Sequence, residues 1–182
     1  MRYTVSVFGS GTIKKSSPAW SQAHKIGFLL AKTGFNVMNG GYGGAMSASA
    51  QGAKQAGGKT VGVTTSEYGD VKANAFIDRE IQLPFWRERL HQLIELADGF
   101  VVLDGGTGTV TEFMVVWEML SKRLHLKPIV VLGKRMRLLV QFLKRNPEVA
   151  FPRQLYIAKT PKDAVRFLTR EIKLPSPLVG EG

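Results

Sequence analysis

The chain contains 182 residues and no cysteine, with 44% hydrophobic residues, 21% charged residues and a formal net charge of +11. This length and composition predict one soluble globular domain that is large enough to bury a substantial core. The absence of cysteine excludes disulfides, thiolate zinc sites and cysteine nucleophiles, and the three histidines are too scattered to predict a metal site.

The amino-terminal residues lead directly into a strand and lack the apolar region of a signal peptide. No apolar run approaches the roughly 20 residues that are needed to cross a bilayer. We therefore expect a cytoplasmic protein without a membrane partner.

The first third of the chain alternates strands, glycines and helices. A first helix is predicted to begin at Pro18, where the missing N–H has no cost, and to end at Gly34. A second helix ends at Ala56 and consists almost wholly of small residues, which allow close packing against a sheet, a ligand or another helix. Apolar and β-branched runs predict the strands, at residues 3–8, 35–39 and 59–63.

The rest of the chain continues this alternation after one interruption, residues 64–80, which are expected to form a loop over the site. Further strands are predicted near residues 77–83 and at 99–103, 129–133 and 155–157, and further helices at 85–97, 110–120, 134–145 and 161–172. The pattern predicts a doubly wound parallel α/β sheet in a single domain, residues 1–173, followed by a disordered tail, residues 174–182. Ligands of such a sheet bind beyond the carboxyl ends of the strands.

The most informative stretch is the glycine-rich turn from Asp104 to Glu112, which follows the buried strand at residues 99–103. A strand that ends in glycines and turns into a helix presents free backbone N–H groups to an anion, most often a phosphate. Glu112 is expected in the first helical turn, at the rim of the same pocket. Thr109 and Glu112 are also spaced as a capping box, in which the carboxylate would accept a backbone N–H instead.

Several motifs together resemble the LOG-type proteins, which are cytokinin riboside 5′-monophosphate phosphoribohydrolases. Residues 105–112 match the family hallmark Pro-Gly-Gly-x-Gly-Thr-x-x-Glu at every position after the proline. Arg89, which lies nine residues before Asp98, matches a second hallmark of the family. Residues 7–10 and 40–46 resemble further family blocks.

The resemblance, which covers roughly residues 3–133, implies a Rossmann-like, nucleotide-binding fold. It also implies hydrolysis of the N-glycosidic bond of a nucleoside 5′-monophosphate to free base and ribose 5-phosphate, without a metal or cofactor. Glu112 would stabilise the positive charge that develops on the ribose or activate water, and Arg89 would pair with the phosphate or ribose and orient Glu112. The residues expected to bind phosphate or nucleotide are Gly9, Ser10, Gly40, Gly41, Gly43, Gly44, Met46, Gly105, Gly106, Thr107, Gly108 and Thr109.

Two residues depart from the family pattern. Asp104 stands where the family has a proline, and its carboxylate would repel a phosphate unless it points away. Leu90 replaces the lysine that usually follows the arginine, which removes one cation from the site. Some divergent relatives resemble carriers of the molybdenum cofactor, so the alternative function is a non-catalytic binding protein for a phosphorylated ligand.

The excess of positive charge is confined to one part of the chain. Residues 122–173 hold 14 Lys and Arg against three acidic residues, whereas the remaining residues balance at 11 of each. This asymmetry is typical of a solvated helical surface or of a nucleic-acid contact. We expect only weak, non-specific DNA binding, which disappears near physiological salt.

Two helices carry more apolar residues than one sheet can cover. The helix at residues 110–120 is apolar nearly all round, and the helix that carries Trp86, Leu90, Leu93 and Ile94 has a similar surplus. A two-fold interface between these helices would bury the excess, and the resemblance also implies a dimer. We therefore predict a homodimer whose subunits complete each other's sites. The alternative is that the C-terminal helices cover the surplus within one chain.

Overall fold

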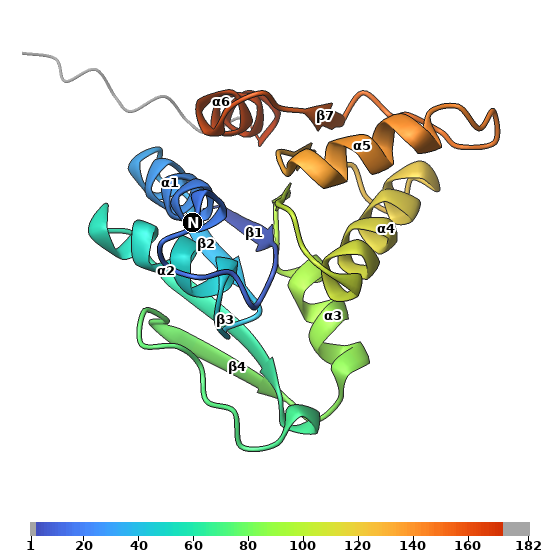
Figure 1. Ribbon diagram of the computed structural model, residues 1–182. Coiled ribbons are helices and arrows are strands. Elements are labelled where there is room, and N and C mark those ends of the chain that lie inside the picture. The colour runs from blue at the N-terminus through green and yellow to red at the C-terminus, as the bar shows by residue number, and fades with distance from the viewer. Residues whose placement is uncertain (1–2, 173–182) are drawn as a thin grey trace, which may run out of the picture.

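The computed structural model describes residues 3–172, which form a parallel sheet with helices on both faces (Figure 1). The strands are β1 (Thr4–Phe8), β2 (Asn36–Asn39), β3 (Thr60–Thr65), β4 (Arg79–Leu83), β5 (Gly99–Val102), β6 (Ile129–Val131) and β7 (Leu155–Ile157). The α-helices are α1 (Pro18–Lys32), α2 (Ala45–Gln55), α3 (Trp86–Glu95), α4 (Thr107–Ser121), α5 (Lys134–Leu143) and α6 (Pro161–Ile172). A short 3₁₀ helix, η1 (Ser66–Tyr68), follows β3. The predicted tail, residues 174–182, lies outside the described residues.

The seven strands follow the order β4-β3-β2-β1-β5-β6-β7, and every neighbouring pair is parallel. The chain builds outward from β1 in one direction and then from β5 in the other. The strand order therefore reverses between β1 and β5, where Phe8 is paired with Val102. Open α/β sheets bind their ligands at such a reversal, beyond the carboxyl ends of the strands. The arrangement confirms the doubly wound parallel fold that the sequence predicted.

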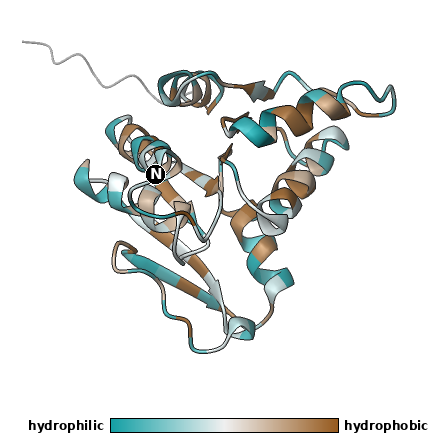
Figure 2. Ribbon diagram, in the orientation of Figure 1, coloured by the Kyte–Doolittle hydropathy of each residue, from teal (hydrophilic) through white to brown (hydrophobic). Residues whose placement is uncertain are grey.

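Helices cover both faces of the sheet and bury its central strands. α1, α2 and α6 lie on one face, and α3, α4 and α5 lie on the other (Figure 1). The side chains of β5 alternate between the two cores, with Val101 in the first and Phe100 and Val102 in the second. Figure 2 shows hydrophobic residues along the central strands and hydrophilic residues along much of the edge strand β4. A strand that is buried on both faces needs a continuous apolar run, which is why β5 was evident from the sequence.

The small residues of α2 allow this helix to pack closely against α1. A Cβ atom on Gly27 would lie 1.9 Å from the backbone oxygen of Ser49, and one on Gly52 would lie 2.0 Å from that of His24. These distances leave no room for a side chain, so the two helices meet backbone to backbone. Helix-to-helix packing therefore accounts for most of the small residues in α2. Among the described residues, no helix is long and apolar enough to span a membrane.

α4 begins at Thr107, several residues before the apolar run that predicted a helix there. Its N-cap is Gly106, and no side chain makes a capping hydrogen bond at this end. Thr109 lies inside the helix and is 4% exposed, and Glu112 lies in the second turn. The expected first-turn position of Glu112 and its capping box with Thr109 are therefore both wrong. The glycines at the start of α4 are poor helix formers and hide this turn from a sequence-based prediction.

Candidate functional site

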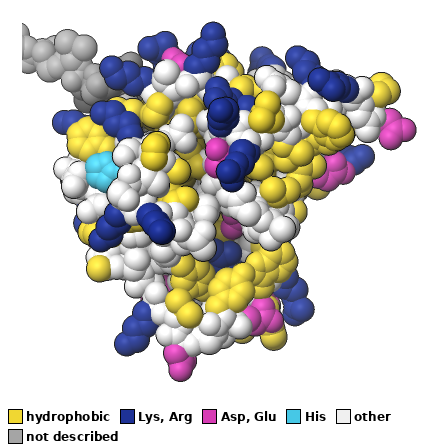
Figure 3. All heavy atoms as spheres, viewed as in Figure 1, with side chains coloured by type: hydrophobic (Ala, Val, Ile, Leu, Met, Phe, Trp, Pro, Cys, Tyr) yellow, Lys and Arg dark blue, Asp and Glu magenta, His cyan; other side chains and the backbone are white. Residues whose placement is uncertain are grey.

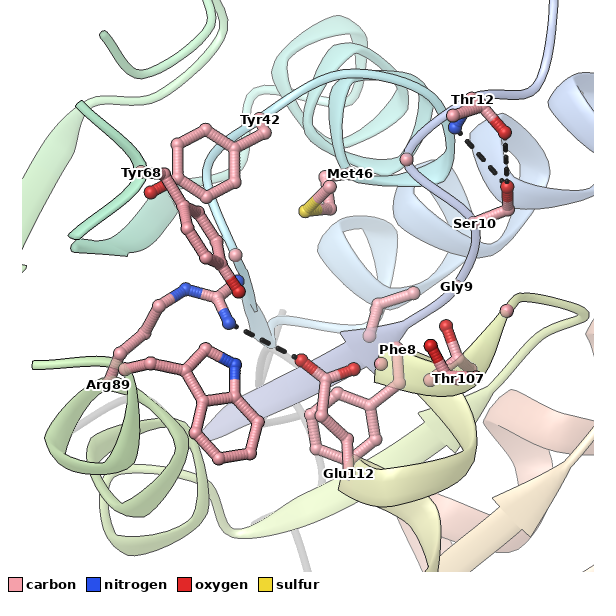
Figure 4. Close-up of a pocket in the computed structure, with 17 residues that line it drawn as sticks. Phe8, Gly9, Ser10, Thr12, Tyr42, Met46, Tyr68, Arg89, Thr107 and Glu112 are labelled. Carbon is pink, nitrogen blue, oxygen red and sulfur yellow. Dashed lines mark hydrogen bonds and ion pairs between the residues drawn. The ribbon is translucent and has the colours of Figure 1, made fainter. Parts of the chain in front are cut away.

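A cavity of about 300 Å³ opens at the carboxyl ends of the central strands, where the three glycine-rich segments meet (Figure 4). Its volume lies at the lower end of the range for small-molecule sites. Figure 3 shows a hollow near the middle of this face, with hydrophobic side chains gathered below it and Lys and Arg side chains above it. The cavity is lined by Val7, Phe8, Gly9, Ser10, Gly11, Thr12, Gly40, Tyr42, Met46, Tyr68, Trp86, Arg89, Gly106, Thr107, Gly108, Thr109 and Glu112.

The glycine-rich segments are packed against one another by backbone contacts. The Ser10 N–H donates to the carbonyl of Asp104 at 3.0 Å, and the Ala45 N–H donates to the carbonyl of Ser10 at 2.7 Å. Gly44 has a φ of +60°, and a Cβ atom there would lie 2.3 Å from the Ser10 oxygen. A Cβ atom on Gly105 would lie 2.1 Å from Oγ1 of Thr109. The glycines are therefore required for the loops to fit together.

Two asparagines hold the turn after β2 from opposite sides. The Asn39 side chain accepts the Gly41 N–H at 2.9 Å and donates to the carbonyl of Met46 at 3.0 Å. The Asn74 side chain donates to the carbonyls of Gly41 and Tyr42 at 2.9 and 2.8 Å. These bonds fix Tyr42 and Met46 at the edge of the cavity. Segment 64–80, which was expected to form a loop over the site, is thus tied to the glycine turn.

Arg89 extends from α3 into the cavity and is only 5% exposed. Its Nε donates to the carbonyl of Val63 at 2.8 Å, and its guanidinium lies 5.5 Å from the centre of the Tyr42 ring. A Cβ atom on Gly40 would lie 1.8 Å from Nη2 of Arg89. Gly40 is therefore needed to leave space for the guanidinium, a role that the sequence did not indicate.

Glu112 faces Arg89 across the cavity (Figure 4). Its Oε1 lies 3.7 Å from Nη1 of Arg89, and its side chain is 14% exposed. Burial raises the pKa of the Glu112 carboxyl to about 7, because the loss of water around the charged form outweighs the attraction of the Arg89 guanidinium. At neutral pH the group is therefore present in both protonation states, as a residue that accepts and donates protons requires.

The two departures from the family pattern have structural explanations. Oδ1 of Asp104 accepts the N–H groups of Arg135 and Met136, at 2.7 and 3.1 Å, and so binds the start of α5. Asp104 does not line the cavity, so its charge does not face an anion bound there. Leu90 packs against the apolar core on the α3 and α4 face of the sheet. The position after Arg89 thus contributes to the core rather than to the site.

One end of the cavity is aromatic. The rings of Tyr42 and Tyr68 lie 5.7 Å apart at a tilt of 50°, and Trp86 lines the same region. η1 carries Tyr68 and is fastened to the start of α3, because the Glu67 carboxylate accepts the Trp86 N–H and the Ser66 hydroxyl donates to the carbonyl of Pro84 at 3.3 Å. The opposite end contains Ser10, Thr12 and Thr107 (Figure 4).

Comparison with known proteins decides the family. The sequence profile of the SLOG cluster4 family matches residues 2–165. The chain belongs to this family. An uncharacterized protein of Archaeoglobus fulgidus is 30% identical over 128 residues, which are 70% of this chain and 82% of that protein.

A cytokinin riboside 5′-monophosphate phosphoribohydrolase of Mycobacterium tuberculosis is 35% identical over 115 residues, or 60% of this chain. The match spans 59% of that enzyme's length. The solved structure of the molybdenum cofactor binding protein from Rippkaea orientalis has a TM-score of 0.77 and 22% identity, with 94% of this chain and 98% of that chain covered. At this identity the structural match shows the fold alone. Together with the family match, these relatives confirm the resemblance to LOG-type proteins that the sequence motifs indicated.

The structure brings most of the predicted site residues together around one cavity in this SLOG cluster4 protein. Gly41, Gly43 and Gly44 do not line it and instead shape the turn behind it, and Gly105 lines a neighbouring cavity. Sequence reasoning missed the aromatic residues of the site and the two asparagines. Tyr42 was detectable, because it is a large aromatic residue in the middle of a glycine turn. Within the described residues, no three His, Asp or Glu side chains are grouped as metal ligands would be.

Replacement of Glu112 by Gln tests the burial of this carboxyl group. The Glu112 pKa is raised from 4.5 to about 7 on folding, so the folded state binds more protons between these values and loses stability as the pH rises through them. We expect Glu112→Gln to gain about 2 kcal/mol in unfolding free energy relative to wild type between pH 5 and pH 8. Urea unfolding at the two pH values measures this change.

The matched control is Glu118→Gln on the same helix, where the side chain is 65% exposed. This variant should follow the wild type within about 0.5 kcal/mol at both pH values. A Glu112→Gln variant whose stability relative to wild type is unchanged between pH 5 and pH 8 would show that the Glu112 pKa is not raised.

Proposed function

We propose that this protein hydrolyses the N-glycosidic bond of a nucleoside 5′-monophosphate to give the free base and ribose 5-phosphate. The observation that carries the proposal is the Glu112–Arg89 pair, which lies one helical turn from a glycine-rich helix start. The sequence similarity to a named phosphoribohydrolase supports the same activity.

The first turn of α4 is the proposed phosphate site. The N–H groups of a first helical turn have no acceptor within the helix, and the helix dipole adds partial positive charge there. Gly106, Thr107 and Gly108 line the cavity at this point, and the two glycines carry no side chain that would keep a phosphate away. Gly9 and Ser10 form the opposite wall.

Glu112 is placed to act on the ribose. It follows Gly108 by four residues, so it lies on the same face of α4, about 5.4 Å further along the helix axis. A ribose whose 5′-phosphate is bound at the helix start would extend its C1′ toward this carboxylate. In the ionised form, Glu112 would stabilise the developing positive charge on the ribose or remove a proton from the attacking water.

The remaining residues orient the reactants. The guanidinium of Arg89 is fixed by Val63 and Tyr42, so it holds the Glu112 carboxylate and offers further N–H donors to the ribose or phosphate. Tyr42, Tyr68 and Trp86 offer aromatic faces to the base. Water is consumed in the reaction: its hydroxyl bonds to C1′, and its proton leaves with the base.

A carrier function is the second candidate. The structural match to a molybdenum cofactor binding protein covers nearly the whole of both chains, whereas the match to the phosphoribohydrolase covers 60% of this one. The same anion site at the start of α4 would hold the phosphate of such a ligand. In that case Glu112 and Arg89 would contact the ligand without breaking a bond.

Turnover by the Glu112→Gln variant separates the two candidates. We expect the wild type to release free base from at least one nucleoside 5′-monophosphate, with kcat/KM falling below about pH 7 as Glu112 becomes protonated. Glu112→Gln should lose ~10²- to 10⁴-fold in kcat and still bind the nucleotide, whereas Glu118→Gln should keep wild-type rates. Chromatography of the free base and titration calorimetry give the two measurements.

Two results would contradict the catalytic proposal. Near-wild-type turnover by Glu112→Gln would remove Glu112 from the chemistry. A wild type that binds a phosphorylated ligand tightly but releases no base would favour the carrier.

We also propose that the working unit is a homodimer. On the outer side of α4, Met114 is 37% exposed, and Phe85 and Leu96 at the two ends of α3 are 42% and 43% exposed. The C-terminal part of the chain covers only part of α4: the Trp117 ring packs against Phe151 at 5.0 Å. The apolar surface that remains on α3 and α4 is the proposed two-fold interface.

Sedimentation of the wild type and of Met114→Glu tests the dimer. We expect a wild-type species of twice the 20.0 kDa chain mass at micromolar concentration. The charged variant should shift toward monomer and lose turnover if the subunits complete each other's sites. A wild-type monomer that retains full turnover would overturn the shared-site arrangement.

A further inference from the structure

A second and larger cavity begins where the first one ends. Its volume is about 930 Å³, compared with about 300 Å³ for the first. The two cavities share Ser10, Thr12 and Gly106, all of which lie at the glycine-rich end (Figure 4). The aromatic end of the first cavity, with Tyr42 and Tyr68, lies on the other side of Glu112. The second cavity is therefore reached past the proposed phosphate site.

The side chains that line the second cavity carry positive charge. Lys14 comes from the loop after β1, and Lys134 and Arg135 come from the start of α5. Among the described residues, none of these three side chains takes part in an ion pair. Asp104 is the one acidic residue in the described lining, and its Oδ1 already accepts the N–H groups of Arg135 and Met136. The first amides of α5 are thus occupied, so the available positive charge is that of the side chains.

The order of the groups along the two cavities limits what enters the second. If the base lies at the aromatic end, the ribose lies beside Glu112 and the 5′-phosphate lies at the start of α4. Any group attached to that phosphate then extends past Ser10 and Gly106 toward Lys14 and Arg135. A nucleoside 5′-monophosphate would leave this cationic space unused.

We propose that the preferred ligand is a nucleoside 5′-diphosphate, or an ester of one, whose second phosphate is bound by Lys14, Lys134 and Arg135. The inference rests on the proposed function for the orientation of the nucleotide, and it changes the substrate class. Water would add at C1′ as before, the base would leave with a proton, and the other product would be ribose 5-diphosphate with its P–O–P linkage intact.

Titration calorimetry with paired nucleotides tests the proposal. The 5′-monophosphates of adenosine, guanosine, cytidine and uridine are compared with the matching 5′-diphosphates at about 0.15 M salt, which limits long-range attraction by the net charge. For the base that binds, we expect the diphosphate to bind on the order of tenfold more tightly, because each of the three exposed cations adds a few-fold at most.

Variants locate the effect within the second cavity. The double variant Lys134→Gln/Arg135→Gln should reduce the preference for the diphosphate to about twofold or less. Arg145→Gln removes a similar exposed charge just beyond α5 but outside the cavity, and it should keep the preference. Equal affinity for the paired nucleotides, or the same loss in the Arg145 variant, would overturn the proposal.

Binding and turnover report separately on the two proposals. A diphosphate preference that depends on Lys134 and Arg135, without release of base, would support the second cavity and contradict hydrolysis. Release of base from monophosphates without any diphosphate preference would support hydrolysis and overturn the extended substrate.

Discussion

The site depends on holding one carboxyl group and one guanidinium largely out of water and next to each other. A charge in such a position is tolerated when it is paired and hydrogen-bonded, and the loss of one partner leaves the other uncompensated. The chain therefore supports Arg89 independently of Glu112, through the carbonyl of Val63, the ring of Tyr42 and the empty space at Gly40. Because this support is rigid, the protonation of Glu112 can change without displacing the guanidinium. A group that must exchange protons during a reaction needs such a surrounding.

The same economy of space explains the departure from the family pattern at Asp104. A Cβ atom on Gly133 would lie 2.5 Å from Oδ1 of Asp104, so the glycine before α5 leaves room for the carboxylate. Asp104 then joins two elements: its carbonyl accepts the Ser10 N–H, and its side chain binds the start of α5. This link draws Lys134 and Arg135 to the edge of the phosphate site. The residue that differs from the family proline thus accompanies the feature that would extend the ligand.

Much of the fold could be predicted from local patterns, whereas the site geometry depends on contacts between distant residues. The buried strand β5 and the helix start at Pro18 are written in apolar runs and in the special chemistry of proline. The start of α4 was hidden because tertiary packing, rather than helix propensity, orders its glycines. The pairing of Glu112 with Arg89 was expected from motif resemblance, but the roles of Gly40 and Val63 depend on how β2 and β3 lie beside α3. Tyr68 reaches the cavity only because Glu67 fastens η1 to the backbone of Trp86.

The central claim is that burial places the protonation equilibrium of Glu112 near neutral pH. The most direct measurement is a carbon-13 NMR titration of the glutamate carboxyl groups, with the Glu112 signal assigned by its absence from Glu112→Gln. The account predicts a midpoint near pH 7 for this carboxyl group. A midpoint near its ordinary value of 4.5 would show a water-exposed carboxylate and contradict the account.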